Sequence, residues 1–330
     1  MYDFELDRIV EEVKRVKAGK VALQLPEGLK PHALSLARKI EEEVNCQAYV
    51  LSDPCYGACD IALQEAKTLG VDLLIHFGHS QLLSVDLPTL YVESTVKLPV
   101  KEAVEKALPL LKGDRVGIAT LIQHWRACEE ARQVLEDAGK KVLIGPPRGR
   151  LKRPGQIIGC DYSTAKDVAN EAESFLFLGG GMIHPVGLRL VTGKPVVAAD
   201  PFKGEAVEVE AYAKKVMAAR VSDIAEASKA RVFGVVVGLK FGQYRPKLIE
   251  KVVDMIRAEG RKVFLIASRE VTPSLELNFP EVEAFVITAC PLIPLFDYEA
   301  YRKPILTPQE AMLSFKSGWS IEDYDPFEGF

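Results

Sequence analysis

One arrangement recurs three times along this 330-residue chain and limits what the chain can fold into. Each copy opens with a short apolar run, continues through a polar turn and then shows the apolar spacing of a one-sided helix. The opening runs are residues 21–25, 115–120 and 232–239. The helices expected after them cover residues 31–44, 126–138 and 246–258. Repetition of one unit predicts three similar domains.

Two further apolar runs follow each helix, and we expect them to be strands. They are residues 48–51 and 73–77, then 141–144 and 175–178, then 262–266 and 284–288. Continuous apolar strands that alternate with helices are typical of parallel sheets covered on both faces. The predicted fold is therefore α/β, with three similar repeated domains around a central site, each a mainly parallel sheet flanked by helices. The predicted domains are residues 1–95, 96–203 and 204–330.

The composition is that of an ordinary soluble globular protein, with 48% hydrophobic and 27% charged residues. The net charge of −4 does not indicate a nucleic-acid partner. Residues 2–20 are predicted to form a charged amphipathic helix, and no apolar run is long enough to cross a bilayer. We therefore expect a cytoplasmic protein without membrane contact. The basic run 148–153 is expected to be a solvated loop, and the tail 324–330 to be frayed.

Six cysteines in a protein expected to work in a reducing compartment favour metal binding or catalysis over disulfides. Cys55 and Cys59 lie between a strand and a helix, in the run SDPCYGACD that starts at Ser52. If the helix begins there, with Asp53 as its cap and Pro54 in its first turn, its N-terminus lowers the pKa of both thiols. The alternative is a pair of buried, inert cysteines.

Cys59, Cys160 and Cys290 each follow a predicted strand, one in each copy. If the copies pack around a pseudo-threefold axis, the three sulfur atoms converge at its centre. Three thiolates suit an iron–sulfur cluster that keeps one iron open, because four ligands would fill it. Structural zinc is the rival, but it prefers four protein ligands in closely spaced pairs.

The remaining candidates allow more than one interpretation. Cys46 and Cys128 are predicted to be packing residues, whereas Cys55 is close enough to the second cysteine of its motif to replace or assist it. His76 and His79 follow a strand, where histidines are more often hydrogen-bonded than bound to metal. The glycine run 179–181 lacks the spacing of a dinucleotide-binding fingerprint.

Taken together, the motifs resemble those of the archaeal diphthamide synthase family. They are Pro26-Glu27-Gly28, the run 53–60, Gly159-Cys160-Asp161, the glycine run with His184-Pro185, and Thr288-Ala289-Cys290-Pro291. The resemblance covers essentially the whole chain, and its first cysteine motif is highly specific. Members of the family are 2-(3-amino-3-carboxypropyl)histidine synthases, an unusual class of radical S-adenosylmethionine enzyme.

The resemblance implies a 4Fe–4S cluster bound by Cys59, Cys160 and Cys290, with S-adenosylmethionine on the open iron. It implies that the sulfur–Cγ bond is cleaved and that a 3-amino-3-carboxypropyl radical adds to one histidine of translation elongation factor 2. It also implies a homodimer. One departure is Leu292, which follows Cys290-Pro291 where the family often continues with arginine.

The charged amino and carboxyl groups of S-adenosylmethionine need polar partners at the carboxyl ends of the strands. The residues expected to bind it are Gln24, Glu27, Gly180, His184, Gln243 and Ser268. Two other functions remain open: a zinc- or iron-dependent hydrolase, and a non-catalytic partner subunit of the same fold. A hydrolase would hold zinc without sulfide, and a degenerate subunit would be expected to lack at least one of the three cysteines.

Overall fold

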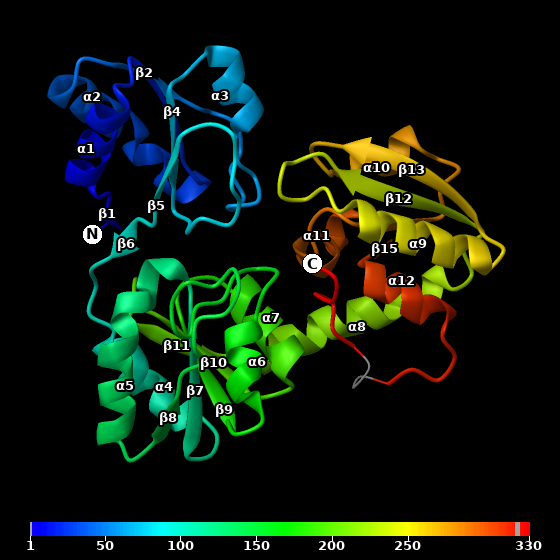
Figure 1. The fold of residues 1–330 in the computed structure, drawn as a ribbon. Coiled ribbons are helices and arrows are strands. Elements are labelled where there is room, and N and C mark those ends of the chain that lie inside the picture. The colour runs from blue at the N-terminus through cyan, green and yellow to red at the C-terminus, as the bar shows by residue number, and fades with distance from the viewer. Residues whose placement is uncertain (1, 321–323) are drawn as a thin grey trace. The chain divides into compact units, whose positions relative to one another are not determined.

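The computed structural model describes residues 2–320 and 324–330. Internal contacts divide the chain into two compact units. The first unit is Met1–Leu98 with the short segments Ile122–Ala127 and Lys240–Gly242. The second unit is Pro99–Leu121, Cys128–Leu239 and Gln243–Phe330. Both are mixed α/β structures in which helices flank mainly parallel sheets, which confirms the predicted fold class (Figure 1).

The first unit is built on a parallel sheet with the strand order β3-β2-β4-β5. Its strands are β2 (Lys20–Gln24), β3 (Gln47–Val50), β4 (Leu73–Phe77) and β5 (Thr89–Val92). A short antiparallel pair joins β1 (Tyr2–Asp3) to β6 (Thr95–Val96). The helices are α1 (Leu6–Val16), α2 (Ala33–Glu43), α3 (Leu63–Leu69) and the 3₁₀-helices η1 (Glu27–His32) and η3 (Ile122–Ala127). The predicted N-terminal helix is therefore shorter than residues 2–20.

Helices cover both faces of this sheet. Ile9 of α1 shares a buried cluster with Ile75 of β4, and Ala66 of α3 shares another with Leu74. Leu74 and Ile75 are neighbours on one strand and point to opposite faces, so the two clusters lie on opposite sides of the sheet. All of β4 is buried, as its almost entirely apolar run predicts.

The second unit contains two sheets. One has the order β11-β10-β9-β7-β8, with only β11 antiparallel, and the other is parallel with the order β13-β12-β14-β15. The strands of the first are β7 (Arg115–Thr120), β8 (Lys141–Leu143), β9 (Ser174–Leu178), β10 (Val196–Asp200) and β11 (Glu205–Glu208). Those of the second are β12 (Val232–Gly238), β13 (Lys262–Ser268), β14 (Ala284–Ile287) and β15 (Ile305–Leu306).

The helices of this unit are α4 (Lys101–Ala107), η2 (Leu108–Leu110), α5 (Cys128–Asp137), α6 (Ser163–Ala169), α7 (Ile183–Thr192), α8 (Glu210–Ala227), α9 (Pro246–Ala258), α10 (Ser274–Asn278), α11 (Leu292–Phe296), η4 (Tyr298–Ala300) and α12 (Pro308–Phe315). Two of them, α5 and α9, confirm the helices predicted over residues 126–138 and 246–258. Cys128 is buried at the start of α5 and Cys46 packs against the first core, as predicted. Within residues 2–320 and 324–330, no helix is both long and apolar enough to cross a bilayer.

All three sheets share one strand order. In each copy the second strand, the first, the third and a fourth lie side by side: β3-β2-β4-β5, β8-β7-β9-β10 and β13-β12-β14-β15. The predicted strands are confirmed, but the fourth strands were not predicted. β15 has only two residues, which is too short to show a pattern. β11 pairs with β10 and so extends the second sheet past residue 203; the three-domain boundaries stay a prediction.

The tail at 324–330 is packed, so the prediction that it is frayed was wrong. Tyr324 is buried, and its hydroxyl donates to Glu310 over 2.8 Å. The Phe327 ring lies 4.9 Å from the ring of Tyr162 and joins the core around the second sheet. Burial of two aromatic rings offsets the entropy lost when a tail is ordered.

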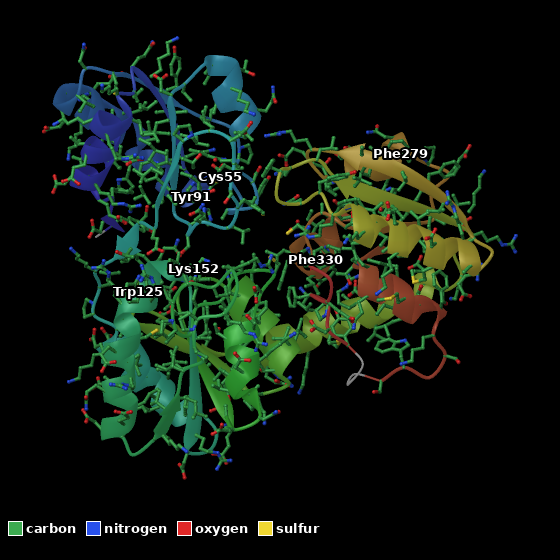
Figure 2. The ribbon with its side chains drawn as sticks, in the orientation of Figure 1. Cys55, Tyr91, Trp125, Lys152, Phe279 and Phe330 are labelled. Atoms are coloured by element: carbon green, nitrogen blue, oxygen red, sulfur yellow. The ribbon has the colours of Figure 1, made fainter. Side chains whose placement is uncertain are left out.

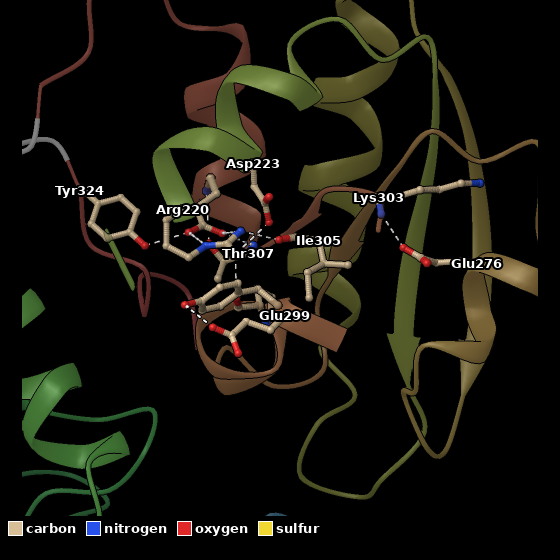
Figure 3. Close-up of polar contacts among 11 residues, drawn as sticks. Arg220, Asp223, Glu276, Glu299, Lys303, Ile305, Thr307 and Tyr324 are labelled. Atoms are coloured by element: carbon tan, nitrogen blue, oxygen red, sulfur yellow. Dashed lines mark hydrogen bonds and ion pairs between the residues drawn. The ribbon is translucent and has the colours of Figure 1, made fainter. Parts of the chain in front are cut away.

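A buried arginine links α8, α11, β15 and α12 in the second unit (Figure 3). Arg220 of α8 and Glu310 of α12 are both fully buried, and Nε of Arg220 donates to Glu310 over 2.8 Å. The other guanidinium nitrogens donate to the carbonyls of Pro294 (2.7 Å) and Ile305 (2.5 Å). A buried charge is costly unless it is paired and hydrogen-bonded. The network therefore fixes how these four elements meet.

Arg220→Met should lower the free energy of unfolding of this region by about 3–5 kcal/mol, because it leaves the Glu310 carboxylate buried without its cation. Urea unfolding followed by the fluorescence of Trp319 measures the loss, since Trp319 packs on the core cluster around β12 and β14. A Trp125→Phe background removes the other tryptophan signal.

Arg189→Met is the matched control. It breaks the pair between Arg189 and Glu210 (2.7 Å), which is partly exposed to water, and should cost about 1 kcal/mol at most. Equal losses in the two variants would contradict the role given to Arg220.

Candidate functional site

Cys55 and Cys59 lie in an irregular loop, residues 51–62, between β3 and α3. The helix begins only after this loop, so the condition of a helix that has already begun at Pro54 is not met. Burial, the largest cause, and the nearby Asp60 carboxylate raise the pKa of the Cys55 thiol to about 12. Cys55 is therefore a neutral, buried thiol, unlike the thiolate that a helix N-terminus would favour.

Gln24, at the end of β2, holds this loop in place. Its Nε2 donates to the Asp60 carbonyl over 2.6 Å, and its Oε1 accepts from the Ala62 N–H over 3.0 Å. The same oxygen lies 2.8 Å from Nδ1 of His76, the neighbour of Gln24 across the sheet. The buried amide predicted to bind a cofactor is thus engaged by the loop that carries Cys59.

Lys30 fastens the beginning of the same loop. Its Nζ donates to the carbonyls of Ser52 (2.7 Å) and Asp53 (3.0 Å). It also pairs with Glu27, the first residue of η1, at 2.6 Å. The Glu27 side chain is 65% exposed, so its carboxylate remains accessible to a ligand.

The segment Lys240–Gly242 packs against the end of the loop. Nζ of Lys240 lies 3.1 Å from Asp60 in a buried ion pair and 4.0 Å from the centre of the Tyr56 ring. The N–H of Gly242 donates to the Cys59 carbonyl over 2.8 Å. A Cβ on Gly242 would lie 2.6 Å from Cα of Cys59, so only glycine allows this approach. The backbone of Cys59 is therefore positioned by this segment as well as by Gln24.

Two histidines, His76 and His79, lie beside Cys55. The ring of His76 lies 5.4 Å from that of Tyr91, and Figure 2 labels Cys55 and Tyr91. Nε2 of His76 is 3.0 Å from Nδ1 of His79. Burial lowers the pKa of His79 to about 4 and holds that of His76 well below its ordinary value. Both imidazoles are therefore neutral at pH 7, and both are hydrogen-bonded, as predicted.

In the second unit, Arg150 holds the loop that carries Cys160. Its Nη2 donates to the Cys160 carbonyl over 3.3 Å, and its Nη1 lies 3.8 Å from Sγ. Its Nε pairs with Asp161 at 3.2 Å. Burial raises the pKa of Cys160, while the charges of Arg150 and Arg245 act in the opposite direction. The prediction of a solvated basic loop was wrong for Arg150, because its guanidinium contacts a thiol.

Cys290 follows β14 and, like Cys160, lies close to Tyr162. Tyr162 is buried, and burial together with the charges of Cys160 and Cys290 raises its pKa. Its hydroxyl has no hydrogen-bond partner within the described part of the chain. Arg245 donates to the Ala289 carbonyl over 2.9 Å. The structure thus gathers two of the three predicted cysteines, with two arginines, around one buried ring.

Leu292 packs next to this group. A Cβ on Gly159 would lie 2.6 Å from Cδ1 of Leu292, so the residue before Cys160 must be small. The positive charges that act on the Cys160 thiol come from Arg150 and Arg245. Arg245 also lies over the ring of Phe330, which Figure 2 labels, at 5.2 Å.

Two of the predicted cofactor-binding residues follow β9. His184, in the first turn of α7, stacks on Phe177 with 6.3 Å between ring centres, and burial lowers its pKa to about 4. A Cβ on Gly180 would lie 3.4 Å from the Asp200 carboxylate. A neutral imidazole and the half-buried backbone of Gly180 therefore both lie after this strand.

The last two predicted cofactor-binding residues, Gln243 and Ser268, belong to the third copy. Gln243 is buried, and its carbonyl accepts from Arg245 over 3.2 Å, which connects it to the Cys290 region. Ser268 ends β13, and its hydroxyl donates to the Glu270 carbonyl. Gln243 is thus joined to the cysteine group through Arg245, whereas Ser268 hydrogen-bonds within its own turn.

The model of the diphthamide synthesis protein family matches residues 25–325. The chain belongs to this family. It is 38% identical to 2-(3-amino-3-carboxypropyl)histidine synthase of Pyrococcus horikoshii, over 94% of this chain and 90% of that protein. It is 32% identical to subunit 1 of the synthase of the same name from Gallus gallus, over 95% of this chain and 76% of the relative.

Solved structures agree with this assignment. The crystal structure of Dph2 from Pyrococcus horikoshii matches with a TM-score of 0.88 and 36% identity, over 97% of this chain and 93% of that one. The structure of the same protein with a 4Fe–4S cluster matches with a TM-score of 0.87, covering 94% of its chain. The family resemblance inferred from the motifs is confirmed.

Sequence reasoning missed the residues that hold the cysteine-bearing segments of this chain in place. Arg150 lies in the loop before Cys160, and Gly242 and Arg245 follow β12. Their partners are Cys160, Cys59 and the Ala289 carbonyl. Nothing in local spacing links Gly242 to Cys59, because contacts between distant segments are set by tertiary packing. The basic run around Arg150 was the one usable signal.

Gly242→Ala should loosen the segment around Lys240, because the added Cβ overlaps Cys59. Overpacking of this kind costs about 1–3 kcal/mol, and even 1 kcal/mol raises an open population about fivefold. Limited trypsin digestion measures the opening, since Lys240 is buried in the folded chain and becomes cleavable when the segment detaches. Faster cleavage after Lys240 is the expected result.

Gly28→Ala is the control, because a Cβ there meets no atom within 4 Å. It should leave the digestion pattern unchanged. Cleavage after Lys240 at the same rate in Gly242→Ala and the parent chain would show that the close approach to Cys59 is not needed.

Proposed function

We propose that this chain transfers the 3-amino-3-carboxypropyl group of S-adenosylmethionine to a histidine of a protein, the first step of diphthamide biosynthesis. Family membership and the names of its relatives support this function. The observation that carries it is the meeting of Cys160 and Cys290 at Tyr162, in a chain similar to a protein crystallised with a 4Fe–4S cluster.

Cys59, Cys160 and Cys290 are proposed as the cluster ligands. Each is a partly exposed cysteine, whereas Cys55 and Cys128 are buried. Three thiolates leave one iron of a 4Fe–4S cluster open, and no other ligand type is needed. When bound and reduced, such a cluster supplies the electron that cleaves the sulfur–Cγ bond of S-adenosylmethionine bound to it.

The neighbouring residues suit a thiolate ligand. A guanidinium 3.8 Å from the sulfur of Cys160 stabilises the deprotonated form, and Arg245 adds a second positive charge. Arg150 also holds the Cys160 backbone, so the ligand and its charge partner move together. These arginines offset the negative charge that three thiolates bring into a partly buried place.

For S-adenosylmethionine, we propose Glu27, Gly180, His184, Gln243 and Ser268 as contacts. Glu27 offers an accessible carboxylate to the ammonium group. Gln24 acts differently in this proposal: its amide is occupied by the loop, so it positions Cys59.

The proposed acceptor is translation elongation factor 2, which supports a cytoplasmic place of action, and the proposed assembly is a homodimer. A protein acceptor supplies binding energy remote from the reacting histidine, which holds that histidine near the cofactor before cleavage. Free histidine lacks this binding energy and should be a poor substitute.

Cys59→Ala, Cys160→Ala and Cys290→Ala should each lower iron and sulfide content, because each removes one proposed ligand. Cys46→Ala and Cys128→Ala are the matched controls and should leave both contents unchanged. Anaerobic purification with iron and sulfide assays and visible spectra measures the effect. If Cys55→Ala removes the brown colour and Cys59→Ala does not, the assignment within the motif is wrong.

With dithionite and S-adenosylmethionine, the chain should release 5′-methylthioadenosine and add one 3-amino-3-carboxypropyl group to archaeal elongation factor 2. Chromatography of the quenched reaction and intact mass spectrometry of the factor measure the two products. Abundant 5′-deoxyadenosine would contradict cleavage at Cγ. If 5′-methylthioadenosine accumulates while the mass of the factor stays unchanged, cleavage at Cγ is supported but the proposed acceptor is wrong.

A further inference from the structure

A second group of ligand-type side chains lies in the first unit, apart from the three proposed cluster cysteines. Cys55 Sγ and one ring nitrogen each of His76 and His79 all lie within 4.8 Å of one another. We propose that these three side chains bind one zinc ion. The proposal concerns a site additional to the cluster and does not depend on the transferase function.

The orientation of His76 supports this site. The Gln24 amide donates to the Asp60 carbonyl and accepts from the Ala62 N–H, and these backbone groups have fixed roles. The amide oxygen therefore faces Nδ1 of His76, 2.8 Å away, and that nitrogen must carry the proton. Nε2 is left with its lone pair directed toward His79. Metal-bound histidines are typically oriented by a second-shell acceptor in this way.

The distances are close to those of a metal site. Around a tetrahedral zinc ion, neighbouring nitrogen and sulfur ligands lie roughly 3.3–3.7 Å apart. Nε2 of His76 and Nδ1 of His79 are 3.0 Å apart, and the Cys55 sulfur lies within 4.8 Å of both donors. Small side-chain rotations are enough to reach the bonding geometry.

The backbone brings the two histidines together. His76 lies on β4, and the chain turns back after Phe77 through Gly78, which has a φ of +80°. A Cβ on Gly78 would lie 2.9 Å from Cγ of Pro26, so glycine is required for both conformation and space. The turn places His79 against His76, and it is held by the Gly78 N–H, which donates to the Val92 carbonyl over 2.7 Å.

The ligand set favours zinc over other common ions. One thiolate and two imidazoles suit zinc, whereas magnesium and calcium prefer oxygen ligands. Binding releases the thiol proton of Cys55. Cys55 and His76 are buried while His79 is partly exposed, so an ion can enter from the His79 side and keep one open position. The ion would tie the loop 51–62 to the end of β4.

The test uses the full chain with Cys59→Ala, Cys160→Ala and Cys290→Ala combined, because empty cluster thiolates would themselves bind zinc. This variant should bind one zinc ion per chain, measured by inductively coupled plasma mass spectrometry after dialysis. Cobalt in place of zinc should give a sulfur-to-metal charge-transfer band and tetrahedral ligand-field bands. Zinc should also raise the melting temperature. The cluster-loaded parent chain should hold the same single zinc ion besides its iron.

Cys55→Ala and His79→Asn, each added to that background, should abolish the charge-transfer band or weaken zinc binding at least tenfold. Cys46→Ala is the matched control and should change neither. Circular dichroism checks that each variant is folded. If a variant does not fold, the number of zinc ions bound by the triple-alanine chain, which keeps Cys55, still tests the proposal. Absence of bound zinc in the background, or binding that survives both substitutions, would overturn the proposal.

Discussion

The arrangement of the cysteine loop in the first unit depends on the hydrogen bonds of the buried Gln24 amide. The loop 51–62 has no regular secondary structure, so its buried backbone groups need partners from elsewhere. Gln24 supplies a donor and an acceptor to the loop and orients His76 with the same oxygen. One side chain at a strand end thereby sets the path of the cysteine loop and the tautomer of its histidine neighbour.

In both units an ion pair lies next to a proposed cluster cysteine. Lys240 pairs with Asp60 next to Cys59, and Arg150 pairs with Asp161 next to Cys160. In each case a long basic side chain neutralises the aspartate that follows the cysteine. The cation also fixes the cysteine loop, because in a partly buried place an ion pair holds a defined geometry. At Cys160 the guanidinium of Arg150 also opposes the rise in the thiol pKa that burial causes.

Two thiols in one motif have different surroundings and different proposed roles. Cys55 is buried beside neutral imidazoles, whereas Cys59 is partly exposed and held through its backbone. A zinc ion on Cys55 would brace the loop that presents Cys59 without competing for it. Separate placement of the two sulfurs explains how cysteines four residues apart can serve two different sites.

The sequence by itself determined the repeated α/β fold, because parallel strands buried on both faces, such as β4 and β9, are almost entirely apolar. It also marked Cys59, Cys160 and Cys290, since the family motifs are local. Predictions from the sequence were wrong where tertiary contacts override the local conformational preference of a residue. Pro54 favours a helix start, yet hydrogen bonds from Gln24 and Lys30 hold the loop in an irregular, non-helical path. The meeting of Cys160 with Cys290, and of Cys55 with His76, was decided only by packing between segments far apart in the chain, which no spacing rule records.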